Sequence, residues 1–376
     1  MTSFWIHPLT IRGLGALALA KAFLAYRSPH RKMSLRHRAE FYDRTWQEAA
    51  RELGGTWTKL SDDISEINFG GFRTRVMLNT SCIDDPVTLE ILGDKPLTHR
   101  LLMAEGLPVP RHTTFSSSKM EPAVRFLQST QRDCVVKPAR GSAGGRGITT
   151  GIRKMSHLAR ATARAAVYSD ELLIEEQIDG DNYRLLYLDG KLIDSLVRRL
   201  PWVTGDGRSS VARLVKQANE QRLRNRTDIS QVLISIDLDM HRTLAGQGLA
   251  LRSVPHKAQR VTLKRVVNEN SGADNTTATP MLCQSIIDDG TKAVRALGVR
   301  FCGLDILTPS PGLPLTQCGG VVLEANSTPG LYHHYKKADG AFPVATHLLK
   351  QIIIGASRDA TAQAQLSRGP RQRQYA

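Results

Sequence analysis

The stretch from Cys134 to Gly147 constrains the fold of this chain more than any other. A short apolar strand ends at Lys137, and a loop with glycines at 141, 144, 145 and 147 leads into a second β-like run at 148–150. Glycines let backbone N–H groups come close to an anion, and a lysine at a strand end adds positive charge. No Gly-Lys-Ser/Thr closes the loop and no helix follows, which excludes a Walker A loop and a dinucleotide fingerprint. The pattern predicts a phosphate-binding hairpin, with an unliganded glycine-rich hairpin as the alternative.

The segments around this hairpin alternate between helical and extended patterns. Apolar spacing predicts helices over 41–53, 95–105, 121–128, 156–168 and 281–297. It predicts strands over 64–72, 74–78, 172–175, 183–188, 191–197, 301–307 and 321–324. Hairpins mixed with α/β units favour an α+β protein with several small lobes over one doubly wound sheet.

Candidate metal ligands lie on the last two predicted strands. Asp305 lies within 301–307, while Glu324 and Asn326 are two residues apart, so their side chains share a face. Two carboxylates and an amide oxygen are hard ligands that suit Mg²⁺ rather than zinc. An acid pair that faces water is the alternative. The adjacent Glu175 and Glu176 are a weaker signal, because neighbouring residues of a strand point to opposite faces.

Composition and charge limit the class of protein and partner. Apolar residues make up 41% and charged residues 23% of 376, which excludes a largely disordered chain, a collagen and a membrane bundle. A net charge of +16 predicts an anionic substrate or partner. Ten of the basic residues lie before Glu40 or after residue 367, where solvated tails are the first interpretation and nucleic acid or anionic lipid are alternative partners. Five cysteines without a CxxC pair favour a reducing, cytoplasmic location.

Residues 1–38 form a basic, partly apolar N-terminal extension. Its apolar segment, 13–26, is shorter than the roughly 20 residues that span a bilayer. A helix docked on the body or lying at a membrane surface is the first interpretation. A disordered extension and a cleaved targeting segment are the alternatives.

Taken in order, these motifs resemble those of the ATP-grasp superfamily over residues 94–335. Within it, the chain is similar to the ATP-grasp part of cyanophycin synthetases, and more loosely so at 268–273. The segments that carry this likeness are 184–187, 190–191, 198–201, 203–210, 268–273 and 276–277. Few residues follow Tyr335, so we expect the Mur-ligase-like half of a cyanophycin synthetase to be lacking, and cyanophycin synthesis itself is not expected.

The resemblance implies an α+β, ATP-grasp fold in which two lobes hold the nucleotide between them. We expect five regions: the extension at 1–38, a short pre-ATP-grasp region at 39–93, the lobe with the glycine-rich loop at 94–180, the C-terminal lobe at 181–355, with an insertion at 201–252 and the metal site, and a basic tail at 356–376.

The resemblance also implies roles for individual residues in nucleotide binding. Lys95 and Lys137 would hold the phosphates, Lys137 being catalytic as well. The loop that closes over them would contribute Gly141, Ser142, Gly144, Gly145 and Gly147. The adenine and ribose would contact Glu175, Glu176, Ile178 and Asn182, the last standing where the superfamily often has an acid.

Further residues are implied in metal and substrate binding. Asp305, Glu324 and Asn326 would hold Mg²⁺, with Mn²⁺ as the alternative metal. Substrate carboxylates or the transferred phosphoryl group would contact Arg184, Arg198 and Arg265, the last two being catalytic. His333 would line the amine site, a polar loop end being the alternative.

The implied activity is that of an ADP-forming ligase. It would join a small-molecule or peptide carboxylate to the amine of an amino acid through an acyl phosphate, making a peptide or isopeptide bond. A homo-oligomer is expected, nucleic acid is the less favoured partner, and a membrane surface would be reached through the N-terminal segment. An ATP-grasp phosphotransferase and a nucleotide-gated binding protein with basic tails are the alternatives.

Overall fold

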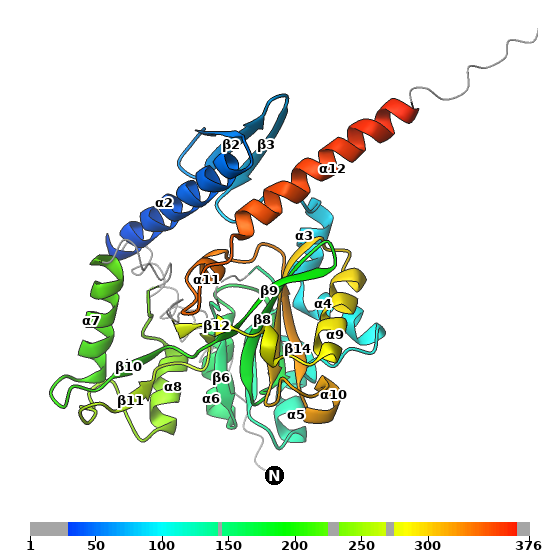
Figure 1. Ribbon diagram of the computed structural model, residues 1–376. Helices are drawn as coiled ribbons and strands as arrows, with labels where there is room; N and C mark the ends of the chain where they lie inside the picture. The colour runs from blue at the N-terminus through cyan, green and yellow to red at the C-terminus, as the bar shows by residue number, and fades with distance from the viewer. Residues whose placement is uncertain (1–28, 142–144, 225–232, 268–273, 367–376) are drawn as a thin grey trace, which may run out of the picture.

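The computed structural model describes residues 29–141, 145–224, 233–267 and 274–366. In this part of the chain the strands form four sheets, and every pairing within them is antiparallel. Helices lie against the sheets (Figure 1). The α+β class expected from the sequence is confirmed.

The glycine-rich loop belongs to a four-stranded sheet. Its strands are, in spatial order, β4 (His112–Ser116), β7 (Glu171–Glu176), β5 (Cys134–Pro138) and β6 (Thr149–Ile152). Helices α5 (Glu121–Ser129) and α6 (Met155–Ala165) share an apolar core with its strands. The loop therefore joins two adjacent strands, as the hairpin pattern predicts.

A five-stranded sheet forms the centre of the molecule. Its order is β12 (Thr276–Thr277), β9 (Lys191–Arg198), β8 (Asp181–Leu188), β13 (Phe301–Thr308) and β14 (Val321–Asn326). Alternate residues of β8 enter different cores: Leu185 packs with α4 (Lys95–Ala104) and α9 (Gln284–Ala296), and Leu186 packs with α2 (Pro29–Glu52) and α12 (Val344–Leu366). The second half of the strand, 185–188, is apolar because both of its faces are covered there.

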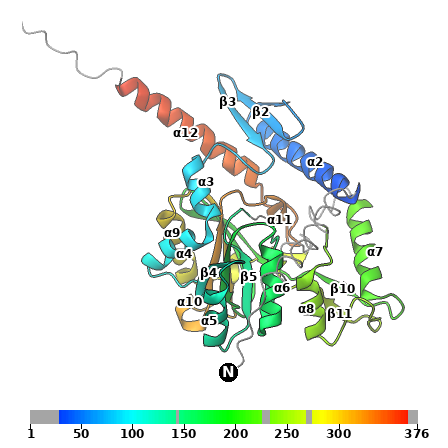
Figure 2. The same ribbon diagram turned by 180° about the vertical axis from the view of Figure 1, so that it is seen from behind.

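The N-terminal lobe packs on one face of this central sheet. It consists of α2 and a sheet of β1 (Thr56–Lys59), β2 (Ile64–Phe69) and β3 (Phe72–Met77). Trp46 of α2 is buried, and its indole Nε1 donates a hydrogen bond to the Leu78 carbonyl at 2.7 Å. Figures 1 and 2 show α2, the β2–β3 hairpin and α12 together on one side of the molecule, with α12 extending outward from it.

A small lobe follows the central hairpin. Strand β10 (Trp202–Thr204) pairs with β11 (Arg260–Thr262), and helices α7 (Val211–Arg224) and α8 (Leu238–Gly246) share an apolar core with them. Because β10 pairs with β11, this lobe extends beyond residue 252, the predicted end of the insertion. The remaining elements are short: α3 (Pro86–Gly93), the 3₁₀ helix η3 (Thr279–Met281), α10 (Leu315–Cys318) and α11 (Tyr332–Tyr335).

Several boundaries differ from those expected. Helix α2 begins at Pro29 and continues through the expected boundary at residue 38, and α12 continues past the expected start of the tail at 356. The run 64–72 contains a turn at Gly70 and Gly71, which both have positive φ and so end β2. Residues 1–28, 142–144, 225–232, 268–273 and 367–376 lie outside the described residues, including most of the extension and part of the tail. None of the described helices combines the length and apolarity needed to span a membrane.

Candidate functional site

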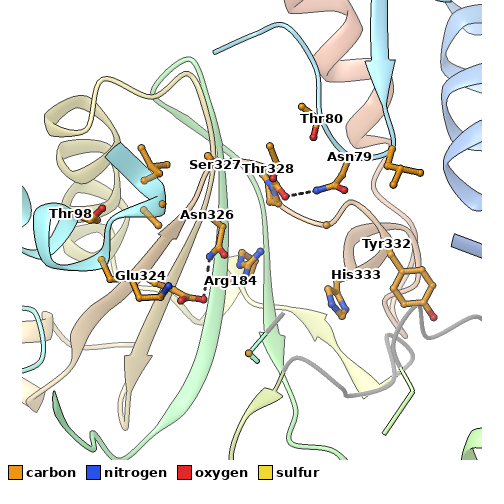
Figure 3. A pocket seen from close by; sticks show the side chains of 18 of the residues that line it. Asn79, Thr80, Thr98, Arg184, Glu324, Asn326, Ser327, Thr328, Tyr332 and His333 are labelled. Atoms are coloured by element: carbon orange, nitrogen blue, oxygen red, sulfur yellow. Dashed lines mark hydrogen bonds between the residues drawn. The ribbon is translucent and has the colours of Figure 1, made fainter. Parts of the chain in front are cut away.

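Two cavities meet where the two larger sheets face each other. The first, here the sheet cavity, measures about 930 Å³ and is lined by residues of β5, β7, β8, β13, β14 and α8. The second, here the loop cavity, measures about 700 Å³ and lies among the segment from the end of β14 to the start of α11, the start of α4 and the N-terminal lobe (Figure 3). Ile148, Arg198 and Glu324 line both cavities. The two spaces therefore adjoin at these three residues.

Lys137 and Glu175 lie on adjacent strands and form an ion pair at the wall of the sheet cavity. The distance from Lys137 Nζ to Glu175 Oε1 is 2.8 Å, and both side chains are 3% exposed. Glu175 Oε2 is buried and accepts no hydrogen bond from any residue that the structure describes. A buried carboxylate oxygen without a donor is costly, so it marks a place where a ligand donor would be stabilising.

Lys95 begins α4 and lines the loop cavity. The Asp94 side chain caps the helix, and the Lys95 backbone N–H donates to the Ala139 carbonyl at 3.2 Å, which fixes the helix start beside the glycine-rich loop. Burial lowers the pKa of the Lys95 ammonium, and the nearby charge of Lys137 lowers it further against the opposing effect of Glu324. Lys95 therefore lies close to a second cation, Lys137, and a bound anion would reduce the repulsion between the two charges.

The described part of the glycine-rich loop has the backbone geometry that requires glycine. Gly141, Gly145 and Gly147 all have positive φ, and a Cβ on Gly147 would meet Tyr168 and Pro138 at 2.8 and 2.9 Å. Gly141 and Gly145 line the loop cavity. Ser142 and Gly144, which the sequence also assigned to the nucleotide, lie outside the described residues.

Asp305 is held by two arginines. Arg184 donates to both of its carboxylate oxygens and Arg198 donates to Oδ2 at 2.9 Å, and all three side chains are buried. Burial would raise the pKa of Asp305, but the two guanidinium groups outweigh it and lower the pKa. Burial lowers the pKa of Arg198 to about 10, so this arginine still carries its charge at neutral pH. The structure thus places Asp305, predicted to bind the metal, in contact with Arg184 and Arg198, predicted to bind the substrate.

Glu324 and Asn326 point to the same side of β14, as the spacing predicts (Figure 3). Asn326 Nδ2 donates to the Gly303 carbonyl at 3.1 Å and to Glu324 Oε1 at 3.4 Å, which leaves its Oδ1 without a donor from the described residues. These hard oxygens fit a divalent cation. Among the described residues, however, no three His, Cys, Asp or Glu side chains are grouped closely enough to hold one, so other ligands must come from a bound molecule.

The remaining predicted contacts of the nucleotide line the sheet cavity. Glu176 lies at its edge, but its Oε1 accepts from Arg111 at 2.9 Å and from Thr130 at 2.8 Å. Ile178 lines the cavity, and Oδ1 of the buried Asn182 accepts no hydrogen bond within the described ranges. Of the two carboxylates, Glu176 is thus engaged at the cavity edge, and Glu175 is the one with a buried oxygen that no described residue contacts by a hydrogen bond.

The structure places Arg265 and His333 in different cavities. Arg265 lines the sheet cavity with an exposed side chain, and its backbone N–H donates to Asp239 Oδ2 at 3.1 Å. His333 lines the loop cavity, with Nδ1 3.3 Å from Asn275 Nδ2. Burial and the nearby charge of Arg198 hold the pKa of His333 well below its usual value, so its ring is neutral.

The sequence reasoning missed the contribution of the N-terminal lobe to the loop cavity. Arg38 and Asn79 line it, and Arg38 Nη2 donates to Asn79 Oδ1 at 2.7 Å. Asn79 Nδ2 in turn donates to the Thr328 carbonyl at 2.5 Å (Figure 3). One signal was present: Arg38 lies four residues before the buried Tyr42, so the two share a face of the helix.

Comparison with known proteins agrees with this architecture. No family model matches the sequence. The chain is 30% identical over 297 residues to the cyanophycin synthetase of Trichormus variabilis, across 77% of this chain and 32% of that protein. It is 31% identical over 262 residues to a glutathione biosynthesis bifunctional protein of Enterococcus faecalis, across 68% of this chain and 34% of that protein. The chain thus spans about a third of the length of these curated relatives.

A solved structure shows the same fold. The bifunctional glutathione synthetase from Pasteurella multocida superposes with a TM-score of 0.53 at 24% identity, covering 83% of this chain and 44% of that one. The order of the motifs, the two facing antiparallel sheets and the similarity to cyanophycin synthetase lead to one conclusion: the chain belongs to the ATP-grasp superfamily.

Proposed function

We propose that this protein is an ADP-forming ligase that joins a carboxylate to an amine through an acyl phosphate. The observation that carries the proposal is that two cavities adjoin at Arg198 and Glu324. One cavity has the residues for a nucleotide and the other has room for a second substrate. A reaction that moves a phosphoryl group between two bound molecules needs such an arrangement.

The sheet cavity would hold ATP. Its phosphates would extend to the junction with the loop cavity, with Lys137 on the sheet-cavity side and Lys95 and the glycine-rich loop on the loop-cavity side. Glu175 Oε2 and Asn182 Oδ1 are buried acceptors to which no described residue donates, and they are suited to the amino and hydroxyl groups of a nucleoside. Glu324 and Asn326, with Asp305 behind them, would hold Mg²⁺, which neutralises phosphate charge when bound.

The loop cavity would hold the carboxylate and then the amine. A carboxylate oxygen attacks the γ-phosphorus, the bond from the γ-phosphorus to the bridging oxygen breaks, and ADP leaves. The amine nitrogen then attacks the acyl carbon and gives up a proton, and phosphate leaves with the electron pair of the C–O bond and can take up that proton. Arg198 lies where the cavities meet and offers a positive charge to the phosphoryl group in transfer.

His333 would position a substrate rather than remove a proton. Asn275 Oδ1 accepts from the Arg199 backbone N–H at 3.2 Å, so its Nδ2 group is the one that faces His333 Nδ1. A neutral ring that accepts at Nδ1 carries its proton on Nε2. The side chain would therefore offer its Nε2–H as a hydrogen-bond donor.

Finer features follow from the same proposal. We expect Mg²⁺ as the working metal with Mn²⁺ as a substitute, a carboxylate-bearing small molecule or peptide and an amino acid as substrates, a homo-oligomer in solution and a cytoplasmic location.

The test is turnover by the purified chain with Mg-ATP and pooled amino acids and short peptides, with and without hydroxylamine. ADP and phosphate release with hydroxamate formation is expected, because hydroxylamine traps an activated carboxylate. Lys137→Met and Glu324→Gln should each lower turnover by at least about a hundredfold, since each removes a charge at the phosphates. Lys119→Met, an exposed lysine in the turn after β4, is the matched control.

Three other results would change the assignment. AMP release would contradict an acyl-phosphate mechanism. ADP release with a phosphorylated product and no hydroxamate would indicate a phosphotransferase. Full turnover by folded Lys137→Met, with folding checked by circular dichroism, would remove the proposed site.

A further inference from the structure

Arg38 is a cation of the loop cavity whose charge is not balanced by the described residues. It lines the cavity from α2, and its Nη2 donates to Asn79 Oδ1 at 2.7 Å. Its Nε is buried, and within the described part of the chain it has neither a hydrogen-bond partner nor a carboxylate at ion-pair distance. Arg184 and Arg198 differ in this respect, because Asp305 balances them.

The surroundings of Arg38 hold the guanidinium in place without neutralising it. Asn79 is fixed by its bond to the Thr328 carbonyl, so its own oxygen faces Arg38. The Tyr42 ring lies 5.8 Å from the guanidinium carbon. Burial raises the pKa of Tyr42 to about 12, so the phenol stays neutral and does not act as a counter-ion.

The other charges that line the loop cavity leave Arg38 without a partner. Asp63 lies on an exposed turn and forms no ion pair with Arg38. Glu324 and Lys95 lie where this cavity approaches the proposed phosphate site. Arg38 lines the loop cavity but not the sheet cavity. A partly buried guanidinium with free donors is stabilised most by a planar anion that accepts two parallel hydrogen bonds.

We propose that Arg38 binds a substrate carboxylate that is not joined in the reaction, which makes it a specificity-determining residue contributed by the N-terminal lobe. The assignment rests on the proposed function for the two substrates that occupy the loop cavity. A carboxylate fits the fork of the guanidinium, whereas Lys95 and Lys137 are the cations proposed for the phosphates. The group belongs either to the acid substrate or to the amino acid that attacks it.

Binding without turnover tests this inference. Thermal-shift and calorimetric titrations would be run with Mg²⁺ and a non-hydrolysable ATP analogue. The probes are free L-amino acids and dipeptides, each compared with its C-terminal carboxamide. The wild-type protein should prefer the carboxylate of at least one pair, and Arg38→Gln should weaken that carboxylate by about tenfold to a hundredfold while leaving the carboxamide unchanged.

Two variants serve as controls. Arg36 is on the same helix, its side chain is 81% exposed and it pairs with Glu40, so Arg36→Gln should behave as the wild type. Arg38→Lys keeps the charge without the fork and should fall between the wild type and Arg38→Gln, which keeps the test decisive if Arg38→Gln folds poorly. Affinity for the ATP analogue should be the same in all of them.

Turnover then separates the two sources of the carboxylate. If Arg38→Gln raises KM for the acid in the hydroxamate reaction, the group belongs to the acid substrate. If hydroxamate formation is unchanged and only KM for the amine rises, it belongs to the amino acid.

Clear outcomes overturn the inference. It is wrong if Arg38→Gln keeps the carboxylate preference, or if the wild type does not distinguish any carboxylate from its carboxamide. Because the titrations need no chemistry, a protein that binds carboxylates through Arg38 yet makes no hydroxamate would refute the proposed function alone. A protein that makes hydroxamate but shows no such preference would refute this inference alone.

Discussion

Two lysines and one glutamate set the charge of the proposed phosphate site. Lys137 is paired with Glu175 at 2.8 Å, whereas Lys95 has no ion-pair partner among the described residues. A buried ion pair contributes little net stability, but removal of one partner leaves an uncompensated charge and costs about 3–5 kcal/mol. The two lysines are therefore not equivalent: Lys137 is held by its pair, and Lys95 is the cation more readily changed by a ligand or by pH.

The pKa of Lys95 predicts an alkaline loss of nucleotide affinity. Burial lowers this pKa from 10.5, so the ammonium loses its proton, and with it the attraction for phosphate, at a lower pH than an ordinary lysine. kcat/KM for ATP reports the free enzyme and should fall as the pH rises through this pKa. kcat should fall less, because the bound phosphates favour the charged form.

The variant Lys95→Arg provides the comparison. Arginine keeps its proton to a much higher pH, so the alkaline fall in kcat/KM should move upward or disappear. Identical pH profiles for the two proteins would assign the fall to another group.

At the scale of elements, α8 forms a wall of the sheet cavity and holds the strand that returns from the glycine-rich loop. Asp239 of α8 is buried and accepts from Thr150 Oγ1 at 2.6 Å and from the Thr150 backbone N–H at 3.3 Å. Its other oxygen accepts from the Arg265 N–H at 3.1 Å. Arg242 of the same helix donates to the Thr150 carbonyl at 2.9 Å. The small lobe thus supports β6 and Arg265 together.

Asp239→Ala should therefore weaken nucleotide binding without a change at the phosphate contacts. It leaves buried donors on Thr150 and Arg265 unsatisfied, which predicts a loss of about 2–3 kcal/mol in the free energy of unfolding. KM for ATP should rise more than kcat falls. Glu220→Gln, which removes only surface ion pairs of α7 in the same lobe, should change neither quantity measurably. Urea unfolding and steady-state kinetics check both, and an unchanged KM in a folded Asp239→Ala would show that α8 does not shape the cavity.

The sequence predicts the elements whose signals are local. Strand alternation and turn glycines are enough to predict β5, β7 and the β8–β9 hairpin around the glycine-rich loop. Arg184 and Asp305 are 121 positions apart, so no local pattern shows that they pair. Sequence analysis therefore predicts different ligands for them, a substrate for Arg184 and a metal ion for Asp305. Arg38 was assigned to a solvated extension for the same reason, since only the packing of α2 on the central sheet brings it to the loop cavity.

At the scale of the whole molecule, the fold gathers charges of both signs where its two cavities adjoin. Lys95, Lys137, Arg184 and Arg198 face a group of three carboxylates, Glu175, Asp305 and Glu324. These residues come from both sheets and from α4, so this combination of positive and negative charges forms only in the folded protein. The net charge of these side chains is slightly positive, which favours binding of a nucleotide but not of a free divalent cation.

This balance predicts that the metal binds with the nucleotide and not before it. Mn²⁺, followed by electron paramagnetic resonance, should bind the protein alone at least about tenfold more weakly than the protein with ADP, since the phosphates supply the missing negative charge and ligands. Glu324→Gln should weaken binding in the presence of ADP, whereas Glu90→Gln, an exposed acid on α3, should not. The prediction depends on Asp305 remaining neutralised by Arg184 and Arg198 in solution. Tight, stoichiometric Mn²⁺ binding without nucleotide would mean that the arginines release Asp305, and that the protein alone carries the metal site.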